Sequence, residues 1–253
     1  MKKILFILTA CFSAISLIAQ EKPQYLEIDY QMEMKFDFEK IMANVPPQWK
    51  SQVEEPLRQE IKKGIFVDYK LKTNGTESEY KMQEKINNDQ TPAGMILQQI
   101  TAMDKEPLYK DIKQQYYLKP YNMGKIYLMK DSLQNINWKI SKEKEQIAGF
   151  DTYKATGVIN DSVPVTAWYS PKLNIKDGPD RLWGLPGLIL KTEFEMNGAE
   201  IIITATNVAV KDEEIKINKP TKGQEISEKE FYEEMKALQE KYKEMYGEGV
   251  DTE

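Results

Sequence analysis

The chain has 253 residues with 35 basic and 40 acidic side chains, a formal net charge of −5, and no histidine. The lack of histidine excludes Ser-His-Asp and Cys-His triads, zinc sites built on imidazole, and histidine acid–base catalysis. The acidic excess is diffuse, which argues against nucleic acid and against electrostatic docking on an anionic membrane as partners. We therefore expect a protein that is not an enzyme and that has no catalytic residues, no bound metal and no cofactor.

Residues 1–19 have the pattern of a secretory signal peptide. Two lysines precede an apolar run without charge, and a polar sequence begins at Gln20. The run is shorter than the roughly 20 residues that a permanent membrane-spanning helix needs. We expect cleavage near Ala19 and secretion to the periplasm or cell envelope, and not an integral membrane protein.

Cys11 allows a second interpretation of the same segment, because residues 8–11 match a bacterial lipobox in which the cysteine is lipidated. A lipoprotein normally becomes polar soon after its cysteine, whereas this chain stays apolar as far as Ala19. We therefore prefer ordinary cleavage to lipidation at Cys11. The mature protein then has no cysteine, which excludes a disulfide and a thiolate nucleophile.

Residues 25–38 alternate strictly between apolar and polar side chains. Period-two alternation over this length predicts a long antiparallel strand with one face in water. Met32 and Met34 could bind a soft metal. Because they share their face with Tyr30 and Phe36, packing in the core is the better interpretation.

Residues 41–64 have the spacing of an amphipathic helix. After a proline pair, one apolar residue recurs every four positions from Trp49 to Ile61. Pro56 lies inside this segment and must kink or split the helix. We expect the helix to cover one end of a sheet. A mobile lid over a ligand cavity is the alternative.

Further strands are expected between residues 65 and 210, where alternating segments are separated by hairpin dipeptides such as Asn74-Gly75. The segment 108–140 is rich in tyrosine. Such residues could line a cavity for an apolar or carbohydrate ligand. We prefer to interpret them as core and rim residues of strands.

A second helix is expected at about residues 227–246. Ser227 and Glu230 form a capping box before a narrow apolar stripe. The helix ends at Gly247, and residues 248–253 are expected to be a flexible tail. The narrow stripe indicates a helix that packs on the sheet edge or pairs with a partner.

These elements predict a single domain over residues 20–247 that is mainly β (α+β). Its expected architecture is a large curved antiparallel sheet or incomplete barrel, with an early amphipathic helix and a C-terminal helix. This outline is similar to that of periplasmic lipoprotein carriers, in which a curved sheet covered by helices holds acyl chains.

A constrained turn leads into a buried strand near residue 187. Gly184 and Gly187 bracket Pro186, and the apolar residues 188–190 follow. Glycine tolerates positive φ, and proline fixes φ and donates no hydrogen bond. The stretch offers no nucleophile, base or metal ligand beyond its backbone, so we expect it to set the angle of a central strand. Trp183 is expected to wedge beside it.

The chain resembles the GLPGLI family of secreted Bacteroidetes proteins on the residues of this turn. The hexapeptide after which the family is named consists of Gly184, Leu185, Pro186, Gly187, Leu188 and Ile189. The aromatic pair Trp168-Tyr169 and the pair Gly178-Pro179 precede it, as in the family. Family members often carry a cysteine where this chain has residues 151–153. The family is defined by sequence, so the resemblance implies no activity.

The first functional hypothesis is a secreted, non-enzymatic binding or carrier protein of the periplasm or envelope. Its ligand would be an apolar small molecule or a lipid, because aromatic and apolar side chains on curved strands can line a cavity for such a molecule.

The second hypothesis is a protein–protein interaction module that docks on an outer-membrane transporter or another envelope partner. Trp168, Tyr169, Arg181 and Trp183 would form its binding surface, because tryptophan, tyrosine and arginine are enriched at interface hot spots.

The third hypothesis is a hydrolase that uses Asp177 and Asp180 as acid and base. Acidic residues in turns usually serve the turn itself, so this hypothesis ranks last.

Overall fold

The structure, a computed structural model, describes residues 25–43, 45–84, 94, 98, 102, 104–122, 124–196 and 198–247. The expected signal peptide, Cys11 and the tail 248–253 lie outside the described residues. The helices are α1 (Phe38–Ala43), α2 (Pro47–Lys63) and α4 (Glu228–Gly247). The strands are β1 (Tyr25–Phe36), β2 (Ile65–Thr73), β3 (Glu77–Met82), β4 (Leu108–Asp111), β5 (Tyr116–Asn122), β6 (Ile126–Ser132), β7 (Lys139–Ile147), β8 (Phe150–Ile159), β9 (Val163–Ser170), β10 (Leu188–Met196), β11 (Ala199–Lys211) and β12 (Gln224–Ile226).

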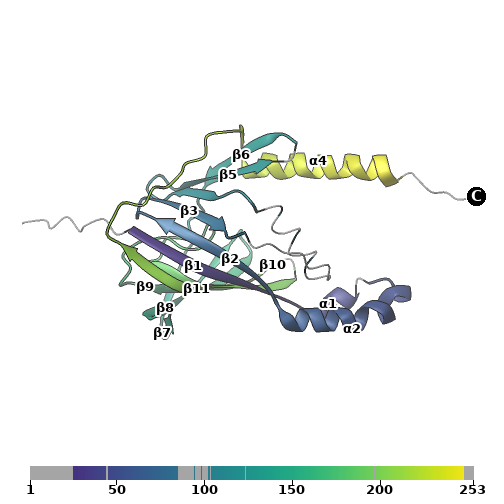
Figure 1. Cartoon of the computed structure of the whole chain (residues 1–253), viewed down its shortest axis with the longest axis horizontal. Coiled ribbons are helices and arrows are strands. Elements are labelled where there is room, and N and C mark those ends of the chain that lie inside the picture. The colour runs from purple at the N-terminus through teal and green to yellow at the C-terminus, as the bar shows by residue number, and fades with distance from the viewer. Residues whose placement is uncertain are drawn as a thin grey trace, which may run out of the picture.

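All of these strands belong to one sheet in the order β12-β6-β5-β4-β3-β2-β1-β11-β10-β9-β8-β7 (Figure 1). The order contains two antiparallel meanders, β1 to β6 and β7 to β11, which are joined where β1 pairs with β11. Among the described strands, β12 alone pairs in parallel, with β6. The predicted large antiparallel sheet with an early helix and a C-terminal helix is therefore confirmed.

The connection between β6 and β7 requires the sheet to curve. These strands stand second and twelfth in the order, ten intervals apart. In a flat sheet they would lie about 48 Å from each other, at about 4.8 Å for each interval. The connecting residues 133–138 reach at most about 25 Å when fully extended. The sheet must therefore curl until its two sides approach each other, as in an incomplete barrel.

Strand β1 has the alternation that the sequence predicts. Leu26, Ile28 and Tyr30 are almost completely buried, whereas the residues between them are half-buried. The predicted strand was two residues too long, because Phe38 begins α1. The carboxylate of Asp37 accepts hydrogen bonds from the backbone N–H groups of Glu39 and Lys40, which stops the strand by capping the helix.

The early helix lies at one end of the sheet (Figure 1). Helix α2 runs without a break through Pro56, so the predicted split does not occur. Its first apolar residue, Trp49, is 52% exposed. Its Arg58 guanidinium lies 4.0 Å from the ring centre of Phe38 on α1, a cation–π contact that holds the two helices together.

Helix α4 starts with the predicted capping box. The Ser227 hydroxyl accepts a hydrogen bond from the Glu230 N–H at 3.2 Å, and the Glu230 carboxylate accepts one from the Ser227 N–H at 2.9 Å. Phe231 is buried, and its ring centre lies 4.5 Å from that of Tyr121 on β5 and 5.9 Å from that of Tyr127 on β6. Helix α4 therefore packs against β5 and β6, next to one edge of the sheet, as expected.

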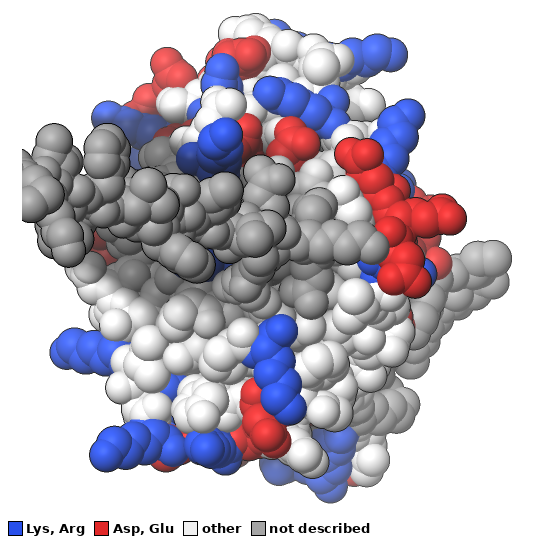
Figure 2. Space-filling model, turned by 90° about the vertical axis from the view of Figure 1, so that its left-hand side faces the viewer, with Lys and Arg blue, Asp and Glu red and all other residues white. Residues whose placement is uncertain are grey.

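No helix in the described part of the chain is long and apolar enough to cross a membrane. Figure 2 shows basic and acidic side chains interspersed on the described part of one face. The charges on that face do not separate into one large field of a single sign, in agreement with the diffuse charge of the sequence.

The Gly-Leu-Pro-Gly turn at residues 184–187, just before β10, packs closely against the backbone at the end of β9. Gly187 has φ +149°, and a Cβ atom at this position would lie 2.2 Å from the Ser170 carbonyl oxygen. The N–H of Leu188 donates to the Leu173 carbonyl at 3.0 Å, so the turn is hydrogen-bonded to the segment that follows β9. Residues 188–190 have no exposed surface. Leu188 and Leu190 pack in the large core and Ile189 in a second one, which explains the continuous apolar run.

We expect Gly187→Ala to lower the free energy of unfolding by more than about 3 kcal/mol, because both strain and a backbone clash oppose the new Cβ. The matched control is Gly149→Ala, where φ is +81° but no atom lies within 4 Å of the new Cβ. Only strain acts there, at about 1–2 kcal/mol. Urea denaturation measures both variants. Equal losses would contradict a role for the close approach.

Candidate functional site

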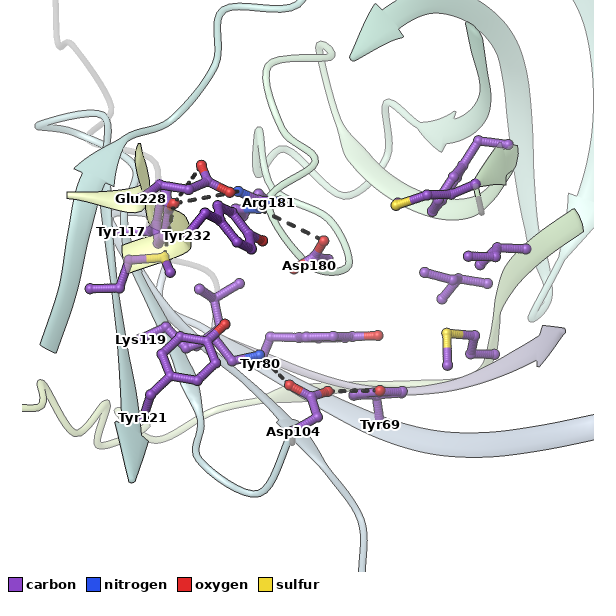
Figure 3. A pocket seen from close by; sticks show the side chains of 17 residues that line it. Tyr69, Tyr80, Asp104, Tyr117, Lys119, Tyr121, Asp180, Arg181, Glu228 and Tyr232 are labelled. Carbon is purple, nitrogen blue, oxygen red and sulfur yellow. Dashed lines mark hydrogen bonds and ion pairs between the residues drawn. The ribbon is translucent and has the colours of Figure 1, made fainter. Parts of the chain in front are cut away.

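A cavity of about 260 Å³ lies between the two meanders. Its lining comes from strands β1 to β6, β10 and β11, from helix α4, from the segment before β4 and from the loop before β10. Strands that are far apart in the sheet order can share a cavity only on the concave side of a curled sheet. The cavity therefore occupies the concave face, and it has an apolar region and a polar region (Figure 3).

The apolar region is a continuous patch on three neighbouring strands. Met32 on β1 lies opposite Ile203 on β11, and Ile201 on β11 lies opposite Phe194 on β10. Met196 extends the patch along β10. Of these five side chains only Ile203 is buried, whereas the others are half-buried. Apolar surface therefore remains open to the cavity.

The polar region contains two ion pairs. The Arg181 guanidinium donates to the Glu228 carboxylate at 2.7 Å, and the Tyr117 hydroxyl donates to the same carboxylate at 2.9 Å. Lys119 on β5 is paired with Asp104. The first pair joins the loop before β10 to α4, and the second joins β5 to the segment before β4.

Both cations stay charged near neutral pH. Burial alone would lower the pKa of Lys119, but the carboxylate of Asp104 outweighs burial and raises it. Burial likewise opposes the charge of Arg181, and Asp180 and Glu228 raise its pKa above the usual value. The cavity therefore contains fixed charges of both signs.

Asp180 is the acidic side chain of the cavity with the weakest partner. Its carboxylate is 51% exposed, and the nearest cation is the neighbouring Arg181, with 4.0 Å between Oδ2 and Nε. Asp180 has φ +49°, a left-handed conformation that is uncommon outside glycine and is better tolerated by Asp and Asn. In Figure 3 its carboxylate projects toward the middle of the cavity. The loop therefore presents this charge through a strained backbone.

Tyr80 is a buried residue whose hydroxyl has no hydrogen-bond partner among the described residues. Only 6% of Tyr80 is exposed, and its ring stacks on that of Tyr69 with 4.7 Å between ring centres. Burial, followed by the influence of Tyr69 and Asp180, raises the pKa of Tyr80 well above its usual value. The hydroxyl therefore stays protonated, and in Figure 3 it points toward the interior of the cavity.

A buried ion pair holds the loop that carries Asp180 and Arg181. The Lys110 ammonium on β4 donates to Asp177 Oδ1 and to the Gly178 carbonyl, both at 2.6 Å. The side chains of Lys110 and Asp177 have no exposed surface. The same carboxylate oxygen of Asp177 accepts the N–H of Gly178 at 2.8 Å.

Two tryptophans fix the other end of this loop. The indole N–H of Trp138 donates to the Trp183 carbonyl at 2.9 Å, and the indole N–H of Trp183 donates to the Gln134 carbonyl at 2.8 Å. These two hydrogen bonds hold Trp183 in place directly before the turn, as expected. At the end of the loop next to Asp177, Gly178 allows close packing against β10, since a Cβ atom at its position would lie 2.8 Å from Ile189 Cβ.

The residues proposed as a docking surface lie mostly in the interior. Trp168 and Trp183 are each 9% exposed and Tyr169 is 4% exposed. Arg181 is partly exposed and lines the cavity. None of the hexapeptide residues lines this cavity or the smaller recess of about 80 Å³ that shares Asp180 and Arg181 with it.

Asp177 and Asp180 do not form a shared site. Asp177 is completely buried against Lys110 and lines neither the cavity nor the recess. The two carboxylates therefore cannot act together as acid and base on a ligand in the cavity. No group of three or more possible metal-ligating acidic or cysteine side chains occurs within the described residues.

Sequence reasoning missed the other polar residues of the cavity: Tyr80, Asp104, Lys119 and Glu228. The tyrosine-rich segment was the available signal. Tyr117 and Tyr121 line the cavity, as the less favoured interpretation of that segment supposed.

Residues 157–191 match a family described as a protein of unknown function (Porph_ging). This stretch is less than half of the chain and includes the hexapeptide that carries the resemblance to the GLPGLI family. The match does not confirm the GLPGLI name. No curated protein matches the chain.

Among solved structures, the chain is similar to PNGF-II in two crystal forms. The C2 form has a TM-score of 0.52 and 20% sequence identity, and the P21 form has 0.50 and 19%. Each comparison covers 83% of this chain and 32% of the PNGF-II chain, so this chain spans about a third of that protein. At this identity the likeness shows the fold alone.

A putative outer membrane lipoprotein-sorting protein domain from Vibrio parahaemolyticus is also similar, with a TM-score of 0.27 and 8% identity. The comparison covers 76% of this chain and 87% of that domain. A TM-score this low supports no argument about function.

We expect Lys110→Met to lower the free energy of unfolding by about 3–5 kcal/mol, because it leaves the Asp177 carboxylate buried without a cation. The double variant Lys110→Met/Asp177→Asn removes that unpaired charge and keeps an acceptor for the Gly178 N–H. It should be more stable than the single variant in chemical denaturation. A double variant that is less stable than Lys110→Met would contradict this account of the buried pair.

Proposed function

We propose that the protein is a non-enzymatic binding or carrier protein of the periplasm or cell envelope, with the cavity of the concave face as its site for an apolar ligand. The observation that carries this proposal is the half-buried apolar patch on β1, β10 and β11, centred on Ile201, Ile203 and Phe194. An apolar surface at the floor of a concavity gains free energy when a ligand replaces the water there, by about 25 cal/mol for each Å².

The polar region suits orientation of a ligand better than catalysis. The chain has no histidine, and Asp177 is inaccessible. The two cations of the cavity are already paired with carboxylates, which fixes their positions. A few fixed polar groups beside an apolar surface are the usual composition of a binding pocket.

The proposed location rests on the sequence of residues 1–19, whose basic start, apolar run and small residue before Gln20 are typical of a secretory signal peptide.

Docking of an envelope protein on the four aromatic and arginine residues has less support. Trp168, Tyr169 and Trp183 are buried, and each indole or ring is already packed against its own chain. A partner could reach little more than Arg181 without opening the fold.

The binding proposal predicts that the purified protein takes up a fluorescent apolar dye and that Ile201→Lys weakens this uptake at least about tenfold, since the substitution places a charge in the apolar floor. The matched control is Ile140→Lys on β7, where the isoleucine is 52% exposed and does not line the cavity. It should bind the dye like the wild type. Circular dichroism checks that both variants are folded.

Native mass spectrometry of protein purified from its host provides an independent test. We expect a small molecule or lipid to be retained by the wild-type protein and lost from Ile201→Lys. Wild-type protein that retains nothing and takes up no dye would contradict the proposed function.

A further inference from the structure

We infer that the ligand is an amphiphile whose polar end is a protonated amine and not a carboxylate. This inference rests on the proposed function, and it assigns the polar region of the cavity to recognition of a positive charge. The apolar patch on β1, β10 and β11 would hold the body of the ligand, with its amine near Asp180 and Tyr80.

The first support is the charge balance of the cavity. Its described lining has three acidic side chains, Asp104, Asp180 and Glu228, and two basic ones, Lys119 and Arg181. The net formal charge of the lining is therefore −1. A cation in the cavity would neutralise this charge, whereas an anion would add to it.

The second support is the difference between the acidic side chains. Glu228 and Asp104 each have a close cationic partner. Among the described residues, Asp180 is paired only with its own neighbour Arg181, at 4.0 Å, and it lines the cavity from a backbone in the left-handed conformation. A cationic ligand could therefore pair with the Asp180 carboxylate without breaking a close ion pair.

The third support is Tyr80, whose buried hydroxyl lacks a partner within the described residues. A hydroxyl oxygen can accept a hydrogen bond from an ammonium group. A buried polar group without a partner destabilises the free protein, and a bound donor would remove that cost. The faces of tyrosine rings also attract cations, and Tyr69, Tyr80, Tyr121 and Tyr232 all line this cavity.

A carboxylate ligand could accept a hydrogen bond from the Tyr80 hydroxyl, but it would find no unpaired cation in the described lining of the cavity. The cations that it needs are engaged, since Arg181 is bound to Glu228 and Lys119 to Asp104. A fatty acid would have to break one of these partly buried pairs and leave a carboxylate without its partner.

The test uses two probes of equal chain length and opposite charge, decylammonium and decanoate, in isothermal titration calorimetry at pH 7 and below the concentrations at which they form micelles. We expect decylammonium to bind at least about tenfold more tightly than decanoate. Equal affinities, or tighter binding of decanoate, would overturn the inference.

The variant Asp180→Asn removes the charge and keeps a residue that tolerates φ +49°. It should bring the affinity ratio of the two probes close to one. The matched control is Asp161→Asn, which removes the same charge from a residue with φ +59° that lines neither the cavity nor the recess. It should keep the wild-type ratio. A ratio that is unchanged in Asp180→Asn would exclude Asp180 as the recognition group.

Tyr80→Phe separates ligand contact from stability. The free variant should be as stable as the wild type or more stable, because an unpartnered hydroxyl is removed. Its affinity for decylammonium should fall about threefold to tenfold. Wild-type affinity would show that the hydroxyl does not contact the ligand.

The outcomes also separate this inference from the proposed function. If the apolar dye binds but neither decyl probe does, the inference is wrong and the proposed function stands. If neither the dye nor the probes bind, the proposed function fails as well.

Discussion

The arrangement of the cavity depends on the buried ion pair between Lys110 and Asp177. Withdrawing two charges from water is costly, and further hydrogen bonds to the pair offset part of that cost. Here the Gly178 carbonyl accepts a second hydrogen bond from the ammonium, and the Gly178 N–H donates to Asp177 Oδ1, whereas Oδ2 has no hydrogen-bond partner among the described residues. Lys110 belongs to the first meander and Asp177 to the loop before β10 in the second. The pair therefore fixes the position of that loop relative to the opposite half of the sheet.

Curvature of the sheet brings this fixed loop next to the cavity. The β1–β11 pairing joins the meanders, and the short connection between β6 and β7 forces their outer sides toward each other. The buried hydroxyl of Tyr30 on β1 donates to the Ile189 carbonyl at 2.5 Å and adds a link between the central strands and the turn. The loop then lies beside both regions of the cavity, because Arg181 reaches α4 while Asp180 faces the apolar patch.

Local features of the sequence were predictable and the contacts of the site were not. Alternation from Leu26 to Met34 and the capping box of α4 depend on neighbouring residues, so both can be recognised from the sequence. Lys110 and Asp177 are separated by 67 residues, and no periodicity relates them. The burial of Trp183 has the same cause, because its indole is satisfied by the distant carbonyl of Gln134. Interface hot spots and core anchors use the same residue types, so composition could not distinguish them.

The hexapeptide is therefore best understood as a support for the site. Gly187 cannot carry a side chain against the Ser170 carbonyl, and the first residues of β10, 188–190, are buried on both faces, so the segment has little freedom to move. Rigidity at this point lets the preceding loop hold Asp180 in a left-handed conformation next to the cavity. Strained residues persist only where the surrounding structure determines their position. Under the proposed function, this motif without reactive groups would contribute to recognition by immobilising the backbone that presents the charge of Asp180.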